Sequence, residues 1–299
     1  MFNFYDYVRL FVFVIATYIL ATRKAKIWVV ADLLFSVSLG VWMLIGKPSP
    51  AGLFSSKLDP FHVYLIQSVG CYVMISALFW FQSHKTRDYN VMKAIMLNRT
   101  MAVGMFTFLD VINCYRFPKL FTSLHYNTLC FGVLWLLGSA YQLIRHGLPT
   151  LRHEYKMSIN WFLKADLGIT AFVGLCSLLL PSYLLSLQSM KTNDLHEHFC
   201  QLFGACLMAS SILSYMALGF RDSADKKAVL ISRAMVNVLI LLCYICGCMF
   251  RGITFTTRDV LLDSLIVPFI LAPTLGVYIH RDRRTSVSGD GYYLRSRDD

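Results

Sequence analysis

The sequence predicts an all-α, polytopic membrane protein with about nine transmembrane helices, built as a tandem duplication. Of its 299 residues, 57% are hydrophobic and only 15% are charged, whereas a soluble domain carries about 25% charged residues. Together with a mean hydropathy of +0.56, this composition excludes a soluble globular protein. The net charge of +11 comes from short basic clusters between long apolar runs. We therefore expect the lipid bilayer, and no nucleic acid, as a partner.

Nine apolar stretches are long enough to cross a bilayer, which takes about 20 helical residues. Each is predicted to be a helix, because backbone polar groups inside lipid must be hydrogen-bonded within the segment. The predicted spans are 4–21, 28–46, 62–82, 93–114, 126–144, 160–180, 198–219, 229–250 and 259–280.

The basic residues indicate how the chain is oriented. With nine crossings, about 17 Lys and Arg fall on one face of the membrane and about seven on the other. The positive-inside rule then places the C-terminus in the cytoplasm and the N-terminus in a lumen or outside the cell. The tail 281–299 is polar and is predicted to be disordered. Within it, Ser286 follows two arginines, as in sites that basophilic kinases favour, and is a phosphorylation candidate.

The chain repeats itself at an offset of 134 residues. This offset pairs Asp32 with Asp166, and between residues 31 and 101 about 19 of 71 positions are identical, against roughly five expected from composition. The repeated unit holds four helices, an even number, so both copies enter the membrane in the same direction as parallel repeats. Asp110 and Asp263 have no acidic counterpart in the other copy. The predicted divisions are a first repeat at 1–134, a second at 135–258, a final transmembrane helix at 259–280 and the tail.

Two acid and base pairs recur in this duplication, namely Asp32 with Arg99 and Asp166 with Arg233. Each member lies five or six residues inside its apolar stretch, roughly 8 to 9 Å below the cytoplasmic interface. The two charges of a pair can therefore meet, within a repeat or across the two. Three interpretations stay open: the pairs lock helices together, they form a gate or ligand site, or the arginines extend to the lipid headgroups.

A second repeated layer lies near the opposite face, where His62 and Gln67 recur as His196 and Gln201. Histidines at an interface usually bind water. One alternative is a pH-responsive pair, because imidazole titrates near neutral pH. The other is a metal site formed by the segment 196–198 and Cys200 beside His62 or His125. We predict no metal, because the spacing is not that of a known metal motif and the first repeat has Tyr64 at the position of His198.

A third repeated set is basic and lies at the cytoplasmic ends of the helices. It is expected to order the loops or to bind an anionic ligand or lipid headgroup, and consists of Arg87, Lys93, Arg221 and Lys227.

These features favour a membrane carrier or ligand-binding protein, with a small-molecule or lipid site between the two repeats. The first alternative is a non-catalytic scaffold, chaperone or regulator with a protein partner, in which the charge pairs are only structural. The second is a lipid-modifying enzyme. The sequence has no metalloprotease, nucleophile-elbow or phosphate-loop motif, so neither catalysis nor a cofactor is expected.

Overall fold

A computed structural model gives the structure of the chain, and the residues it describes are 4–45, 53–54, 58–86, 88–150, 158–187, 192–251 and 273–278. Over these ranges the chain is helical apart from short connecting segments. Seven of its helical segments are long and apolar enough to cross a membrane, by length and composition. The protein therefore has the make-up of a multi-pass integral membrane protein.

The helices follow the predicted spans and begin or end a few residues away from them. They are α1 (Phe4–Thr22), α2 (Ala25–Ile45), α3 (Pro60–Val73), α4 (Ile75–Ser83), α5 (Tyr89–Arg116), α6 (Ser123–His146), α7 (Ile159–Leu179), α8 (Pro181–Leu187), α9 (Asp194–Ala217) and α10 (Ser223–Arg251). The predicted helix 62–82 is divided at Met74 into α3 and α4, and the short α8 was not predicted. The predicted span 259–280 and the tail lie outside the described residues, except that residues 273–278 are helical.

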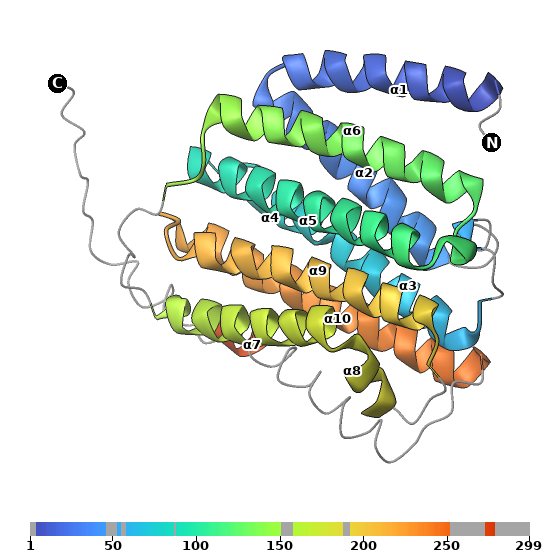
Figure 1. Ribbon diagram of the computed structural model, residues 1–299. Coiled ribbons are helices and arrows are strands. Elements are labelled where there is room, and N and C mark those ends of the chain that lie inside the picture. The colour runs from blue at the N-terminus through green and yellow to red at the C-terminus, as the bar shows by residue number, and fades with distance from the viewer. Residues whose placement is uncertain are drawn as a thin grey trace, which may run out of the picture.

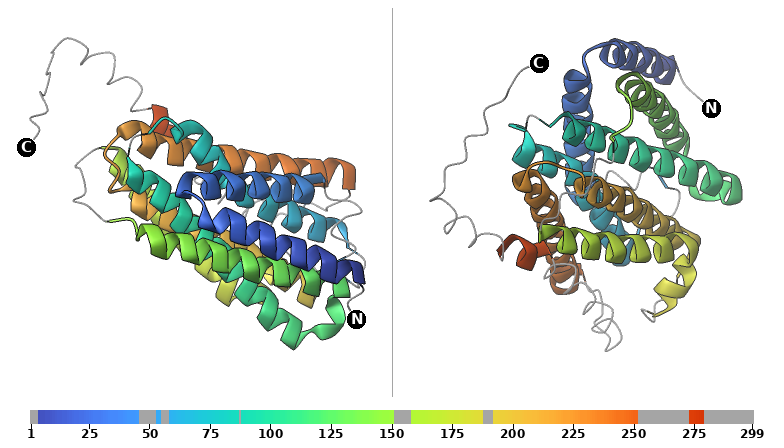
Figure 2. Two further views of the ribbon diagram at one scale, coloured as in Figure 1. Left: turned by 90° about the horizontal axis from the view of Figure 1, so that it is seen from above. Right: turned by 90° about the vertical axis from the view of Figure 1, so that its left-hand side faces the viewer.

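The long helices run side by side in one bundle (Figure 1). Both Figure 1 and the end view in Figure 2 place α1 and α6 at one edge and α7 at the other. In the middle, α5 packs against α6 and α9, while α10 packs against α3 and α4. The segments on either side of the chain midpoint are therefore interleaved, and α9 is packed among helices from the first half of the chain.

Two pairs of glycines let helices approach closely. A Cβ added at Gly70 on α3 would lie 2.9 Å from the carbonyl oxygen of Gly40 on α2, and one added at Gly204 on α9 would lie 2.8 Å from that of Gly174 on α7. Both distances are shorter than a carbon atom can approach an oxygen. Small residues at such crossings allow close backbone contact, which is the main source of helix association where lipid surrounds the helices.

Candidate functional site

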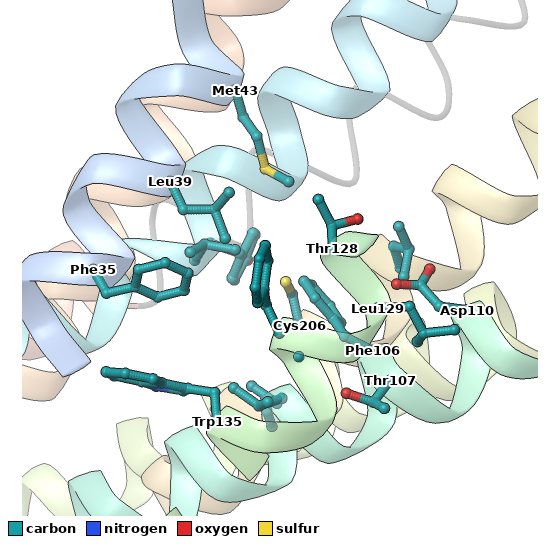
Figure 3. Close-up of a pocket in the computed structure, with 18 of the residues that line it drawn as sticks. Phe35, Leu39, Met43, Phe106, Thr107, Asp110, Thr128, Leu129, Trp135 and Cys206 are labelled. Atoms are coloured by element: carbon teal, nitrogen blue, oxygen red, sulfur yellow. The ribbon is translucent and has the colours of Figure 1, made fainter. Parts of the chain in front are cut away.

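A cavity of about 420 Å³ lies between α2, α3, α5, α6 and α9, and α1 and α4 add a few lining residues. Its walls are mostly apolar and aromatic, and they include Phe35, Leu39, Trp42, Met43, Ala102, Val103, Phe106, Leu129, Trp135, Leu202 and Cys206. Figure 3 shows the Asp110 carboxyl on one side of this group and the Trp135 ring on the other, with Phe106 and Cys206 between them. The cavity therefore has an apolar middle and two different ends.

The first end is marked by the ion pair of Asp32 and Arg99. Arg99 donates from Nε to Asp32 Oδ2 at 2.8 Å and from Nη2 to Oδ1 at 3.2 Å, and Trp135 donates from Nε1 to Oδ1 at 2.7 Å. The other guanidinium nitrogen, Nη1, makes no hydrogen bond among the described residues, and Arg99 lines the cavity. Nη1 of Arg99 is therefore able to donate a hydrogen bond to a ligand in the cavity.

The pair of Asp166 and Arg233 is closed, in the sense that it is buried and hydrogen-bonded to protein groups. Arg233 is 0% exposed, and its Nε lies 3.0 Å from Asp166 Oδ1. Its remaining nitrogens donate to the hydroxyl and the carbonyl of Ser210, and the Ser214 hydroxyl donates to Asp166. The guanidinium also lies 5.6 Å from the centre of the Tyr72 ring. A buried charge pair with its hydrogen bonds satisfied in this way holds helices together and has little left for a ligand.

The difference between the two pairs has a local cause. Ser76 precedes Ser210 by the same 134 residues that separate the two pairs. Its hydroxyl oxygen accepts a hydrogen bond from Asn98 Nδ2 at 2.7 Å. Ser76 is therefore engaged by another side chain, whereas Ser210 accepts from Arg233. The structure brings together both predicted pairs, each between helices on the same side of the chain midpoint, and of the four charged residues Arg99 lines this cavity.

The second end of the cavity gathers an acid and two histidines from three helices. Asp110 Oδ1 on α5 lies 3.9 Å from His125 Nε2 on α6 and 3.5 Å from His198 Nε2 on α9. All three atoms are buried and have no hydrogen-bond partner in the described part of the chain, and the same holds for His125 Nδ1. Buried polar atoms in native proteins rarely lack a hydrogen-bond partner, so a cluster of such atoms indicates a binding site for a polar group of a ligand.

The predicted histidine layer forms a reciprocal helix cap. Asp59 and Asn193 are the N-caps of α3 and α9, and the Nδ1 of His62 or His196 accepts the backbone N–H of the cap on its own helix. Each histidine then turns its Nε2 to the cap of the other helix, at 3.1 Å from Asn193 Oδ1 and 3.2 Å from an Asp59 oxygen. The two imidazole rings stack with their centres 3.6 Å apart.

This geometry favours hydrogen bonding over metal binding. The ligand atoms of Asp59, His62 and His196 lie within 4.8 Å of one another, which is close enough to consider an ion. However, all four imidazole nitrogens already have partners. The rings are also parallel to within 11°, so their in-plane lone pairs do not converge on one point. The helix caps account for these residues without a metal.

The reciprocal cap predicts that Asp59 and His196 stabilise the protein jointly. Asp59→Ala is expected to cost about 0.5 to 2 kcal/mol as a lost cap, and combining it with His196→Ala should cost less than the sum, because the two side chains contact each other. Chemical unfolding of the four proteins in the cycle gives the coupling. Asp88→Ala serves as the control, because Asp88 caps α5 and makes no contact with His196 in the described part of the chain. Additive losses for Asp59 and His196 would contradict the reciprocal cap.

The pH dependence of this cap follows from Asp59. Burial alone would raise the pKa of its carboxyl, but the hydrogen bond from the His62 backbone and the nearby imidazoles outweigh burial and hold that pKa below 3.8. The stability that Asp59 contributes is therefore present above pH 3.8, and it is lost as the pH falls below 3.8 and through the lowered pKa.

Residues 30–278 match the model of a protein family described as a domain of unknown function, DUF8292. The chain belongs to the DUF8292 family. No curated protein and no solved structure matches the chain. The DUF8292 region takes in both ion pairs, the reciprocal cap and the cluster around Asp110, whereas α1 precedes it.

Within the DUF8292 region, the predicted site residues fall in several places. Of the eight ligand or gating candidates, Arg99 lines the cavity, while Asp32 reaches it only through Arg99 and Trp135. Gln67 donates to the Leu44 carbonyl at 2.8 Å, and Gln201 accepts from Asn113. The glutamines therefore tie neighbouring helices together, and the cluster of Asp110, His125 and His198 is the part of the site that sequence reasoning did not assemble.

The basic candidates of the DUF8292 region do not form one cluster in the described residues. Lys93 lies over the Tyr89 ring, with Nζ 5.4 Å from its centre, and Arg221 is exposed, with its backbone N–H 3.4 Å from Asp88 Oδ2. Lys227 is half-buried, and Arg87 and Ser286 lie outside the described residues. The neighbouring Lys226, by contrast, is fully buried and donates to Asn160 Oδ1 at 2.8 Å and to the Leu218 carbonyl at 2.9 Å.

Proposed function

We propose that this protein is a membrane-embedded carrier or ligand-binding protein that holds a small, largely apolar molecule or lipid between α2, α3, α5, α6 and α9. The observation that carries the proposal is an apolar cavity of about 420 Å³ between Arg99, whose Nη1 makes no hydrogen bond in the described part of the chain, and the unpartnered atoms of Asp110, His125 and His198. Small-molecule sites usually have this form, with a few polar groups that orient a ligand held by apolar walls.

We also infer the tandem duplication, and four features at the same spacing support it. Adding 134 to the bounds of α2 gives those of α7, since 25 becomes 159 and 45 becomes 179. The same shift takes 60–83, which α3 and α4 cover, to 194–217, the bounds of α9. The ion pairs and the close glycine pairs recur at this spacing as well.

The duplication suggests that the two copies differ in role, one forming the ligand site and the other a structural ion pair. On this alignment α6 corresponds to 257–280, and no described helix corresponds to α1. We therefore place the repeated unit at 25–146 and 159–280, in place of the divisions 1–134 and 135–258 expected from the sequence, and treat α1 as an addition. The first copy keeps a cavity beside its ion pair, while serines close the second pair. The proposed site therefore lies inside the first copy, with α9 of the second copy as one wall.

Filling the cavity tests this function. Ala102 lines the cavity from α5, so Ala102→Trp is expected to abolish retention of a bound compound. The matched control is Leu137→Trp on α6, because Leu137 is 61% exposed on the outer surface of the bundle. The measurement is mass spectrometry of small molecules and lipids that co-purify with each protein.

A defined compound that wild type and Leu137→Trp retain and Ala102→Trp loses would support a ligand-binding function and name its chemical class. If all three proteins carry the same lipids in the same amounts, the cavity holds no specific ligand. A non-catalytic scaffold or regulator would then be the better account, and the search would turn to protein partners.

A further inference from the structure

Asp110 differs from the other two acids that lie deep in the bundle. Asp32 and Asp166 each form an ion pair with an arginine, at 2.8 and 3.0 Å. For Asp110, the groups of opposite charge within ion-pair distance in the described part of the chain are only His125 and His198. A carboxylate without a cation in an apolar, membrane-embedded site is costly, so it takes up either a cation or a proton.

The two histidines are poorly placed to supply that cation. His198 Nδ1 lies 2.9 Å from Asn113 Nδ2, which is a donor, so this nitrogen is an acceptor and the His198 ring is neutral. A charged His125 would need an acceptor for each of its two N–H groups, yet neither of its nitrogens has a hydrogen-bond partner among the described residues. The negative charge of Asp110 is therefore unbalanced by the protein around it.

Aromatic rings surround the same end of the cavity. The Phe121 ring centre lies 4.4 Å from that of His125, and Phe54 lies 5.6 Å from His125 and 5.1 Å from Phe199. Aromatic faces attract organic cations, most strongly where water is excluded. A carboxylate beside several aromatic rings is a site suited to an ammonium group on an apolar molecule.

We propose that the ligand of this cavity is an amphipathic amine, whose ammonium group pairs with Asp110 and donates a hydrogen bond to a nitrogen of His125. This inference rests on the proposed function and names its ligand class. Arg99 and Asp110 are 11 residues apart on α5, about 16 Å along the helix axis. The apolar body of the amine extends from Asp110 toward Arg99, where Nη1 donates to an oxygen atom if the ligand carries one.

The test compares three probes that share one alkyl chain and differ in their head group: dodecylamine, dodecan-1-ol and dodecanoate. Each is titrated into the full-length protein in nanodiscs, and affinity is measured by isothermal titration calorimetry. Ala102→Trp, which blocks the cavity, gives the background from probe dissolved in the lipid.

We expect wild type to bind the amine at least about tenfold more tightly than the alcohol, because the neutral hydroxyl cannot form the desolvated charge pair with Asp110. The carboxylate should bind most weakly, because its charge has the same sign as that of Asp110. Asp110→Asn should lose at least about tenfold in amine affinity and leave the alcohol within about threefold. Glu197→Gln is the matched control, since it removes a negative charge from α9 at the same end of the bundle but does not line the cavity, and it should preserve the preference for the amine.

The comparison within wild type needs no variant, so it holds even if Asp110→Asn does not fold. An alcohol that binds wild type as tightly as the amine would overturn the proposal, because Asp110 would then carry a proton and recognise a hydroxyl. Preferred binding of the carboxylate would overturn it as well. If none of the three probes binds more than to Ala102→Trp, the ligand-binding function itself fails, which is a different result.

Discussion

Arg233→Ala is expected to destabilise the protein by about 3 to 5 kcal/mol, the usual cost of removing one partner from a buried ion pair. The arginine is 0% exposed and Asp166 is 3% exposed, so the substitution leaves a carboxylate without water or a cation. It also leaves Ser210 without the donors that its hydroxyl and carbonyl oxygens accept from. Urea unfolding in mild detergent, followed by circular dichroism, gives the change in free energy.

Two further variants make this expectation specific to the pair. Asp166→Asn combined with Arg233→Ala should cost less than the sum of the two single variants, because no unpaired charge remains. Arg99→Ala should cost less than Arg233→Ala, because Asp32 keeps the hydrogen bond from Trp135 and the site borders a cavity. Equal losses for the two arginines, or strictly additive losses in the double variant, would show that the second pair is not the closed structure described above.

Gly204→Ala is expected to cost about 1 to 3 kcal/mol, the range for forcing extra volume into a packed interior. The added Cβ would lie 2.8 Å from the Gly174 carbonyl oxygen and 2.9 Å from the Leu178 nitrogen. Both are backbone atoms, so neither can turn aside as a side chain does. The helices α7 and α9 would have to separate, and thermal unfolding in detergent should show a lower midpoint.

Gly168→Ala is the matched control for this experiment. Gly168 lies in α7 and a Cβ there would meet nothing within 4 Å, so alanine should be neutral or stabilise the helix by up to about 1 kcal/mol. If Gly204→Ala were as harmless as Gly168→Ala, the close crossing of α7 and α9 would not contribute to stability.

Sequence reasoning could find the helices and the ion pairs because both follow simple rules. Long apolar runs must be helical in lipid, and the equal depth of Asp32 and Arg99 in their helices was enough to predict that they meet. The break at Met74 was missed, since it lies in a continuous apolar run with no proline or glycine at the break to mark it. The buried position of Lys226 was missed because a lysine at a helix end usually reaches water.

The site around Asp110 could not be assembled from the sequence. Its members lie on three helices, and His125 and His198 are 15 and 88 positions from Asp110, so no motif spacing joins them. Asp110 did stand out as an acid without a repeated counterpart. What brings His198 to it is the packing of α9 against α5, and a contact between helices so distant in the sequence has no periodic signal.

The reciprocal helix cap also sets an order of events during synthesis. His62 Nε2 lies against Asn193, which is 131 residues further along the chain. At about 5 to 20 residues per second, a ribosome needs roughly 7 to 26 s to add that length. For that time α3 is in the membrane without the partner of His62 Nε2, and the cavity lacks the wall that α9 provides. The arrival of α9 therefore completes the cap and supplies one wall of the cavity together.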